Sequence, residues 1–199
     1  MDTKRRILEI SKQLFNEKGY QNVRMRDISS RLGISVGNLT YHFKKKEDIL
    51  KALMAEAAPL EAYPENVSLT SLNQFLYELI QSIQEHLFFF TCDDLFRLNP
   101  EFEQANRIKV ESLIVKFTKI LHELKKNGYF TDALTDKTIE ALVEMMMMAH
   151  LSWARKVNIC GFEVFPVAKF IAYHWHIFEP FLTAKAAEEY AGIKKDFNA

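Results

Sequence analysis

The segment from residue 25 to residue 43 constrains the fold of this chain more than any other stretch. Apolar side chains recur there at helical spacing in two short runs, Ile28 with Leu32 and then Leu39 with Phe43. Between the runs, Gly33 can take the positive φ at which a helix stops, and Ser35 can accept a main-chain N–H and begin the next helix. The segment therefore predicts two short helices, near residues 25–32 and 35–43, joined by a tight turn.

The second of these helices is polar on its outer face. The side chains expected there are those of Asn38, Thr40, Tyr41 and His42. A helix is narrow enough to enter the DNA major groove, where polar side chains can meet base edges and phosphates. This pair of helices therefore predicts a DNA-binding segment.

The charge distribution supports that prediction. The chain of 199 residues has a formal net charge of zero, but residues 1–54 hold 12 Lys or Arg against 6 Asp or Glu, and the remainder holds 14 against 20. A basic segment on an acidic body is expected if only the basic segment meets a polyanion.

Helical patterns continue on both sides of this segment, with few Gly and Pro and no alternating strand pattern. We expect a first helix over residues 3–18 and a fourth that opens near Lys44, with a boundary at Pro59 or Pro64. Further helices are expected over about 68–90, 99–127, 135–157, 165–182 and 183–196. The fold class is therefore all-α.

The residues of the first quarter of the chain resemble those of the tetracycline-repressor (TetR) family. The resemblance covers about residues 3–54. It is carried by Ile7, Ser11, Leu14-Phe15, Gly19-Tyr20, Arg26-Asp27-Ile28-Ser29, Leu32-Gly33-Ile34-Ser35, Gly37-Asn38-Leu39, His42-Phe43 and Lys46-Glu47-Asp48-Ile49-Leu50. It implies a three-helix DNA-binding head, residues 1–46, a connecting helix, residues 46–58, and a body, residues 59–199, that binds a ligand and dimerises.

Two positions depart from the family pattern. Many members have Thr or Ser, which cap the second helix, where this chain has Arg24; Arg24 could instead reach a phosphate. Many also have Tyr where this chain has Thr40, so phosphate contacts of that tyrosine would pass to Tyr41 or be lost.

The expected DNA contacts fall into two groups, because phosphate contacts position a protein and base contacts specify sequence. We assign base edges to Ser35, Val36 and Asn38, with Gly37 letting the backbone approach the DNA. We assign the phosphate backbone first to Lys46, at a helix start with free N–H groups, and then to His42, Tyr41, Thr40, Arg24 and Arg26.

The body is rich in aromatic and methionine side chains, which can line a pocket for an apolar ligand or simply fill a core. The pocket candidates are Phe89, Phe96, Phe117, Met146, His150 and Trp153. The segment from 170 to 181 is apolar nearly all round and needs cover, either from a second subunit or within one chain. The candidates for a dimer interface are Phe170, Tyr173, His174, Ile177, Phe178 and Phe181.

Other classes of protein find little support in the sequence. No nucleophile, zinc-protease or phosphate-loop motif indicates an enzyme, and no cofactor is expected. Zinc binding by His150, His174, His176, Cys92 and Cys160 is not expected, because His174 and His176 point to different sides of a helix and no third ligand is suitably spaced.

The same reasoning gives the expected location and function. With no signal-like start, no bilayer-spanning run and two distant cysteines, we expect a cytoplasmic bacterial protein without membrane contact. We expect a homodimeric repressor, released from a palindromic double-stranded DNA operator by a small apolar effector. A helical scaffold with a DNA-binding head that senses nothing, or a transcriptional activator, are the alternatives.

Overall fold

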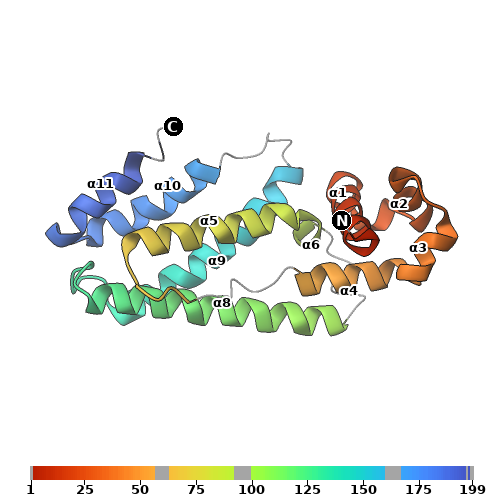
Figure 1. The fold of residues 1–199 in the computed structure, drawn as a ribbon. Helices are drawn as coiled ribbons and strands as arrows, with labels where there is room; N and C mark the ends of the chain where they lie inside the picture. Colours follow the sequence, from red (N-terminus) through yellow and green to blue (C-terminus); the bar gives the residue numbers. More distant parts are fainter. Residues whose placement is uncertain (1, 57–62, 92–99, 160–166, 196, 198–199) are drawn as a thin grey trace. The chain divides into compact units, whose positions relative to one another are not determined.

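The fold was analysed in a computed structural model, which describes residues 2–56, 63–91, 100–159, 167–195 and 197 (Figure 1). The N-terminal helices are α1 (Thr3–Lys18), the 3-10 turn η1 (Tyr20–Asn22), α2 (Met25–Leu32), α3 (Val36–His42) and α4 (Lys46–Glu56). The later helices are α5 (Leu69–Glu85), α6 (Leu87–Thr91), α8 (Pro100–Lys126), α9 (Asp136–Ile159), α10 (Val167–Phe178), η2 (Glu179–Phe181), η3 (Ala184–Ala186) and α11 (Ala187–Lys195). The predicted all-α class is confirmed: the β-structure in the described ranges is one isolated bridge, Phe130 to Leu182.

Local capping explains why most helices begin where the sequence predicted. The Asp2 carboxylate accepts the N–H of Lys4 at 3.2 Å and opens α1. Thr135 does the same before α9, where its hydroxyl accepts the N–H of Thr138 at 3.2 Å. At the other end of α1, Gly19 has φ of 78°, which a side chain would oppose.

By its contacts the chain forms two compact units. The head unit comprises residues 1–59 and 82–105, and the body unit comprises residues 60–81 and 106–199. This division differs from the expected boundary near residue 58, because residues 82–105 belong with the head rather than with the body.

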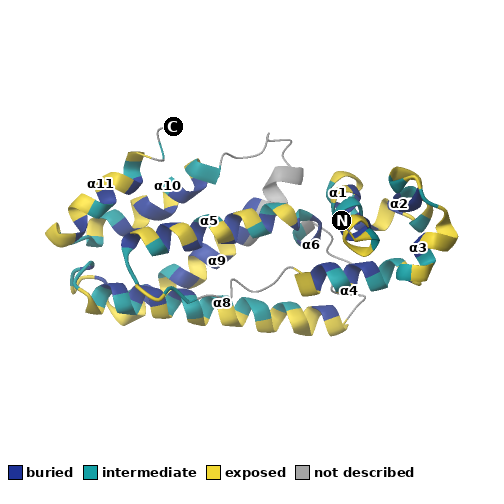
Figure 2. Ribbon diagram, viewed as in Figure 1, coloured by how far each residue is buried: buried dark blue, intermediate teal, exposed yellow. Residues whose placement is uncertain are grey.

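The head unit owes this composition to aromatic packing. Phe88 is only 1% exposed, and its ring centroid lies 5.3 Å from that of Phe15 on α1. Phe89 and Phe102 belong to the same core cluster, which also contains Leu39, Phe43 and Leu53 from α3 and α4. Figure 2 shows the buried residues of α1 and α4 in dark blue. The head core is therefore completed by side chains that come later in the chain.

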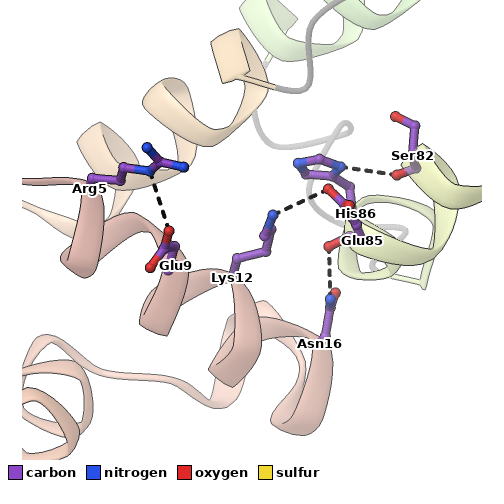
Figure 3. A network of polar contacts seen from close by, with 7 residues as sticks. All are labelled: Arg5, Glu9, Lys12, Asn16, Ser82, Glu85 and His86. Atoms are coloured by element: carbon purple, nitrogen blue, oxygen red, sulfur yellow. Dashed lines mark hydrogen bonds and ion pairs between the residues drawn. The ribbon is translucent and has the colours of Figure 1, made fainter. Parts of the chain in front are cut away.

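A break after α5 was not predicted, because the expected helix ran on to Phe90. The structure ends α5 at Glu85 and begins α6 at Leu87. The side-chain amide of Asn16 donates to the carbonyl of Glu85 at 2.9 Å and accepts the N–H of Phe88 at 3.0 Å (Figure 3). These bonds satisfy main-chain groups that the break would otherwise leave without partners.

The body unit has its own core of α5, α8, α9, α10 and α11. Phe117, Trp175 and Phe178 are fully buried there. Trp175 donates through Nε1 to the side-chain oxygen of Asn73 at 2.8 Å, which joins α10 to α5. The carboxylate of Glu189 on α11 accepts both the N–H and the hydroxyl of Thr70, at 2.7 and 2.8 Å, and so holds the start of α5.

Candidate functional site

The turn between α2 and α3 sets the direction of the exposed α3 face. Gly33 has φ of 68° and ψ of 29°, the left-handed conformation, and its N–H returns to carbonyls of the last turn of α2. The hydroxyl of Ser35 then accepts the N–H of Asn38 at 3.1 Å and starts α3. Leu39 and Phe43 are buried in the head core. The predicted helix-turn-helix geometry is therefore confirmed.

Arg24 does not leave the start of α2 without a cap. Its side chain cannot accept a hydrogen bond, but its main-chain N–H donates to the Asp27 carboxylate at 2.7 Å. The Asp27 carboxylate thus supplies one half of a capping box and places a negative charge at a helix start. The N–H of Asp27, which a Thr or Ser side chain would bind, donates instead to the carbonyl of Arg24 at 2.9 Å. This arrangement frees the Arg24 side chain, which is exposed.

The side chains assigned to DNA separate by exposure. Ser35, Val36, Gly37 and Asn38 are exposed at the start of α3, and Tyr41 is 85% exposed. Thr40 is half-buried and donates its hydroxyl to the carbonyl of Gly37 at 3.0 Å. Tyr41 is therefore better placed than Thr40 to reach a phosphate. The half-buried His42 meets the Tyr41 ring edge-on at 5.3 Å between centroids.

The Lys46 ammonium, for which we predicted a phosphate contact, has partners within the head itself. Its ammonium donates to the carbonyl of Tyr20 at 2.7 Å and to that of Val23 at 2.8 Å, and it lies 4.1 Å from the centroid of the Tyr20 ring. An ammonium group has three donors, so these two bonds use most of its capacity. Without DNA, this side chain clamps the turn that leads into α2.

Four other positively charged side chains of the head are exposed near the helix-turn-helix segment. Arg24 and Arg26 are exposed, and in the part of the chain that the structure describes neither guanidinium forms an ion pair. Lys44 and Lys45 are exposed as well. The exposed α3 face is therefore flanked by unneutralised cations that can meet phosphates.

A network of polar contacts connects α1 to residues 82–86 within the head unit. Lys12 pairs with Glu85 at 3.4 Å, Arg5 pairs with Glu9 at 3.4 Å, and His86 donates from Nδ1 to the carbonyl of Ser82 at 3.0 Å (Figure 3). The ion pairs are largely exposed and contribute little to stability. The bonds of Asn16 to Glu85 and Phe88 are the specific part of this network.

In the body, α9 and α10 meet through a buried aromatic cluster that contains two of the predicted pocket residues. His150 and His174 lie 4.8 Å apart between ring centroids, and the ring of Phe170 lies 5.1 Å from His150 and 4.8 Å from His174. Trp153 stacks on Phe170 at 5.1 Å. We name this set of four residues, His150, Trp153, Phe170 and His174, the histidine cluster.

Both histidines of the cluster are held neutral. Burial is the main cause that lowers the pKa of His150 to about 3, and the nearby His174 adds to the effect. Burial likewise lowers the pKa of His174. Among the residues that the structure describes, their Nε2 atoms and Nε1 of Trp153 have no hydrogen-bond partner, and all three atoms are buried. Such unpaired buried groups each cost about 1–3 kcal/mol, so the cluster is a local weakness in the body.

The remaining pocket candidates are not gathered in one place. Met146 is buried one turn before His150 on α9, and its carbonyl is the acceptor for Nδ1 of that histidine. Phe117 packs instead against Phe75 and Phe178 elsewhere in the body core. Phe89 belongs to the core of the head unit, and Phe96 lies outside the described residues. The described candidates thus belong to separate packed clusters, and one pocket lined by all six side chains stays a prediction.

The predicted dimer interface divides in a similar way. Phe170, His174 and Phe178 are buried within the chain itself, so they need no second subunit for cover. Tyr173 and Ile177, one turn apart on α10, are exposed, and Phe181 is half-buried. On α9, Met145 and Met148 are also exposed. These four exposed residues, Met145, Met148, Tyr173 and Ile177, are named the apolar face.

Two further findings limit the classes of site. Within the described ranges, no group of three or more His, Cys, Asp or Glu side chains could hold a metal ion. Among the helices that the structure describes, none combines the length and apolarity needed to cross a membrane.

The fold and the head together define a helix-turn-helix regulator, and comparisons with known proteins agree. Residues 7–53 match the family model described as bacterial regulatory proteins of the tetR family, and residues 51–190 match the model described as bacterial transcriptional repressor. The chain belongs to the TetR family of transcriptional regulators, which are DNA-binding proteins and not enzymes.

Curated relatives match this chain over limited lengths. The probable HTH-type transcriptional regulator YttP of Bacillus subtilis is 30% identical over 88 residues, which are 42% of each chain. An HTH-type transcriptional regulator of Staphylococcus aureus strain bovine RF122 / ET3-1 is 43% identical over 49 residues, 25% of this chain and 26% of that protein. The chain thus aligns with less than half the length of these relatives.

Solved structures share the whole fold at low identity. A TetR-family transcriptional regulator from Marinobacter aquaeolei VT8 superposes with a TM-score of 0.77 at 21% identity, over 98% of this chain and 99% of that chain. A putative transcriptional regulator from Saccharomonospora viridis, solved with choline, has a TM-score of 0.66 at 22% identity, over 88% of this chain and 95% of that chain.

Proposed function

We propose that this chain is a ligand-responsive repressor that binds a near-palindromic operator as a homodimer and releases it when a small apolar effector occupies the body. The observation that carries the DNA-binding half is the α3 face, where Ser35, Val36, Asn38 and Tyr41 are exposed on a helix anchored by Leu39 and Phe43. Because its inner side chains are packed in the head core, α3 can enter a major groove without a change in conformation.

Within this proposal the DNA contacts are divided anew. Ser35, Val36 and Asn38 face base edges, with Gly37 allowing close approach. Arg24, Arg26 and Tyr41, with support from Thr40 and His42, hold the phosphates. Lys46 acts on DNA binding indirectly, because its ammonium fixes the turn before α2 through Tyr20 and Val23.

The apolar face supports the homodimer. Met145 and Met148 on α9, with Tyr173 and Ile177 on α10, expose large apolar side chains from two helices whose rings meet in the histidine cluster. Large apolar side chains that gather on the surface are typical of an interaction site. Pairing through it would supply a second α3, as a twofold operator requires.

The effector half of the proposal follows from linkage. A ligand that binds better to the body state with low operator affinity shifts the population toward that state by its differential affinity alone. The connecting helix α4 is the lever, because Ile49, Leu50 and Leu53 place it in the head core and the body unit follows it in the sequence.

The test begins with operator selection. The purified protein is mixed with a random duplex library, the bound sequences are read, and the complex is titrated at low and moderate salt. We expect an inverted repeat whose half-sites are about one helical turn apart, with two chains per duplex. A single half-site bound by one chain would overturn the dimer, and no binding at any salt would overturn the function.

Ligand response is tested on the selected duplex. Small-molecule extracts of bacterial cells are added, and release is followed by fluorescence anisotropy. Release by an apolar fraction supports a sensor. If no fraction releases the duplex, the protein is a scaffold with a DNA-binding head, and a reporter gene whose transcription rises with the protein identifies an activator.

A further inference from the structure

The histidine cluster is not explained by the fold or by DNA binding. Three buried polar atoms have no partner within the described ranges: Nε2 of His150, Nε2 of His174 and Nε1 of Trp153. The rings of all three residues lie against that of Phe170. A body core could have avoided unpaired groups by using apolar residues at these positions.

The hydrogen bonds of the two histidines fix what each ring offers. Nδ1 of His150 lies 2.6 Å from the carbonyl of Met146, and Nδ1 of His174 lies 2.8 Å from the carbonyl of Phe170. A carbonyl only accepts, so each Nδ1 carries the proton and donates it. In a neutral ring the other nitrogen, Nε2, is then a bare acceptor.

The cluster therefore presents two acceptors and one donor in an aromatic setting. The donor is the indole N–H of Trp153, and the surroundings are the faces and edges of Trp153 and Phe170. A carboxylate or phosphate would face two lone pairs. A metal ion would lack a third protein ligand within the described ranges. A hydroxyl group fits, because it donates one hydrogen bond and accepts others.

We propose that the histidine cluster is the polar end of an effector site, and that its ligand carries an uncharged hydroxyl group on an apolar, aromatic body. This inference rests on the proposed function, since it names the chemical class of the effector. The hydroxyl donates to Nε2 of a cluster histidine and accepts from the Trp153 indole. The ring of the ligand takes part of the contact surface that Phe170 now fills.

The same two helices carry the apolar face. Met148 precedes His150 by two residues on α9, and Tyr173 adjoins His174 on α10, so each helix bears a cluster residue and a face residue within one turn. A ligand that enters between α9 and α10 must change their packing, because the unpaired atoms are now covered. Because both helices also carry the apolar face, a change in their packing would alter the proposed pairing surface.

The test uses three probes of nearly equal size on the full-length protein. They are 4-propylphenol, 4-propylanisole and 4-propylbenzoate, which offer a hydroxyl, a methylated oxygen and a carboxylate. Binding is measured by calorimetry and by the rise in melting temperature. We expect the phenol to bind at least about tenfold more tightly than either analogue, because only the phenol makes the donated bond. Equal or tighter binding of the anisole or benzoate, or no binding of the phenol, overturns the proposal.

Variants locate the site. His150→Phe and His174→Phe remove one acceptor each and keep a ring in place. We expect the variant that removes the accepting Nε2 to lose the preference for phenol over anisole, while the melting temperature of both variants holds or rises. The matched control is His176→Phe, an exposed histidine on the same helix as His174, which should keep the preference. An unchanged preference in both cluster variants overturns the site.

A measurement on the unaltered protein covers the case in which a variant does not fold. Nitrogen-15 imidazole signals report whether Nε2 gains a hydrogen bond, and we expect the Nε2 signal of His150 or of His174 to shift with phenol. If these signals stay fixed while the phenol binds, the site lies elsewhere. Duplex binding is recorded on the same samples, so a chain that binds its operator but ignores the phenol refutes this inference and leaves the DNA-binding function standing.

Discussion

The α3 surface and the histidine cluster place polar groups in opposite circumstances. In the head, each capping group has a partner: Ser35 binds Asn38, Asp27 binds Arg24, and the Lys46 ammonium reaches two carbonyls. In the body, three ring nitrogens are buried and find no partner in the part of the chain that the structure describes. The head is thus arranged before it meets DNA, whereas the body holds hydrogen-bonding capacity that its own fold does not use.

This difference suggests how the two regions divide the work. A preformed reading surface lowers the entropic cost of binding, because few side chains have to be ordered on contact. Buried polar groups without partners lower the stability of the body, and they favour any state in which a ligand or water supplies those partners. Substitutions in each region, together with pH and salt titrations, test this difference through the free energy of unfolding and the salt dependence of DNA binding.

The largest effect is expected from the head core. Phe15 is fully buried against Tyr20 and Phe88, so Phe15→Ala should lower the free energy of unfolding by about 3–5 kcal/mol. Urea denaturation followed by circular dichroism measures it. The control is Tyr41→Ala, an exposed aromatic of the same unit, which should change stability by less than about 0.5 kcal/mol. Equal losses in both would show that the head is not tightly packed.

A pH effect is expected from the body. His150 has a folded pKa of about 3, below its value in the unfolded chain, so the unfolded state binds the proton first on acidification. This contribution to stability is complete above about pH 6.5 and falls by about 1.4 kcal/mol per pH unit below it, until about pH 3. Denaturation midpoints between pH 7.5 and 5 measure the slope, and His150→Phe should flatten it. The same slope in that variant would mean that other groups cause the acid loss.

Lys46→Met tests whether the clamp is internal. The variant keeps the length of the side chain but loses two charge-assisted bonds to Tyr20 and Val23, so stability should fall by about 2 kcal/mol. The salt dependence of DNA binding should keep its slope. A shallower slope with unchanged stability would return Lys46 to the phosphate role that the sequence suggested.

Arg26→Ala is the counterpart and carries the smallest effect on the fold. The side chain is exposed and forms no ion pair in the described part of the chain, so stability should not change. If the guanidinium neutralises one phosphate, the slope of log affinity against log salt should fall by about 0.9. An unaltered slope would remove Arg26 from the DNA contacts.

The sequence was a good guide wherever structure is decided locally. Asp2, Gly33, Ser35 and Thr135 act through bonds to residues within a few positions, and the helices begin or end there as predicted. Tyr41 also could be placed, because helical spacing alone sets it on the outer face.

The sequence did not predict contacts between residues that are far apart along the chain. Nothing near Asn16 indicates that it binds Glu85 and Phe88, 69 and 72 residues further on. Lys46 sits at a helix start, which suggested a phosphate, but its ammonium is captured by carbonyls 26 and 23 residues earlier. The sequence also could not show which side chains of the apolar segment from 170 to 181 are buried, because that depends on the packing of α10 against α9.

The completion of the head core by Phe88, Phe89 and Phe102 bears on how such regulators can be recombined. A fragment that ended at Glu56 would lack these three rings. The apolar side chains of the head that they cover would be exposed to water, and the fragment would tend to aggregate. A chimaera that joins this DNA-binding head to the body of another regulator must therefore include two separate segments, residues 1–59 and residues 82–105.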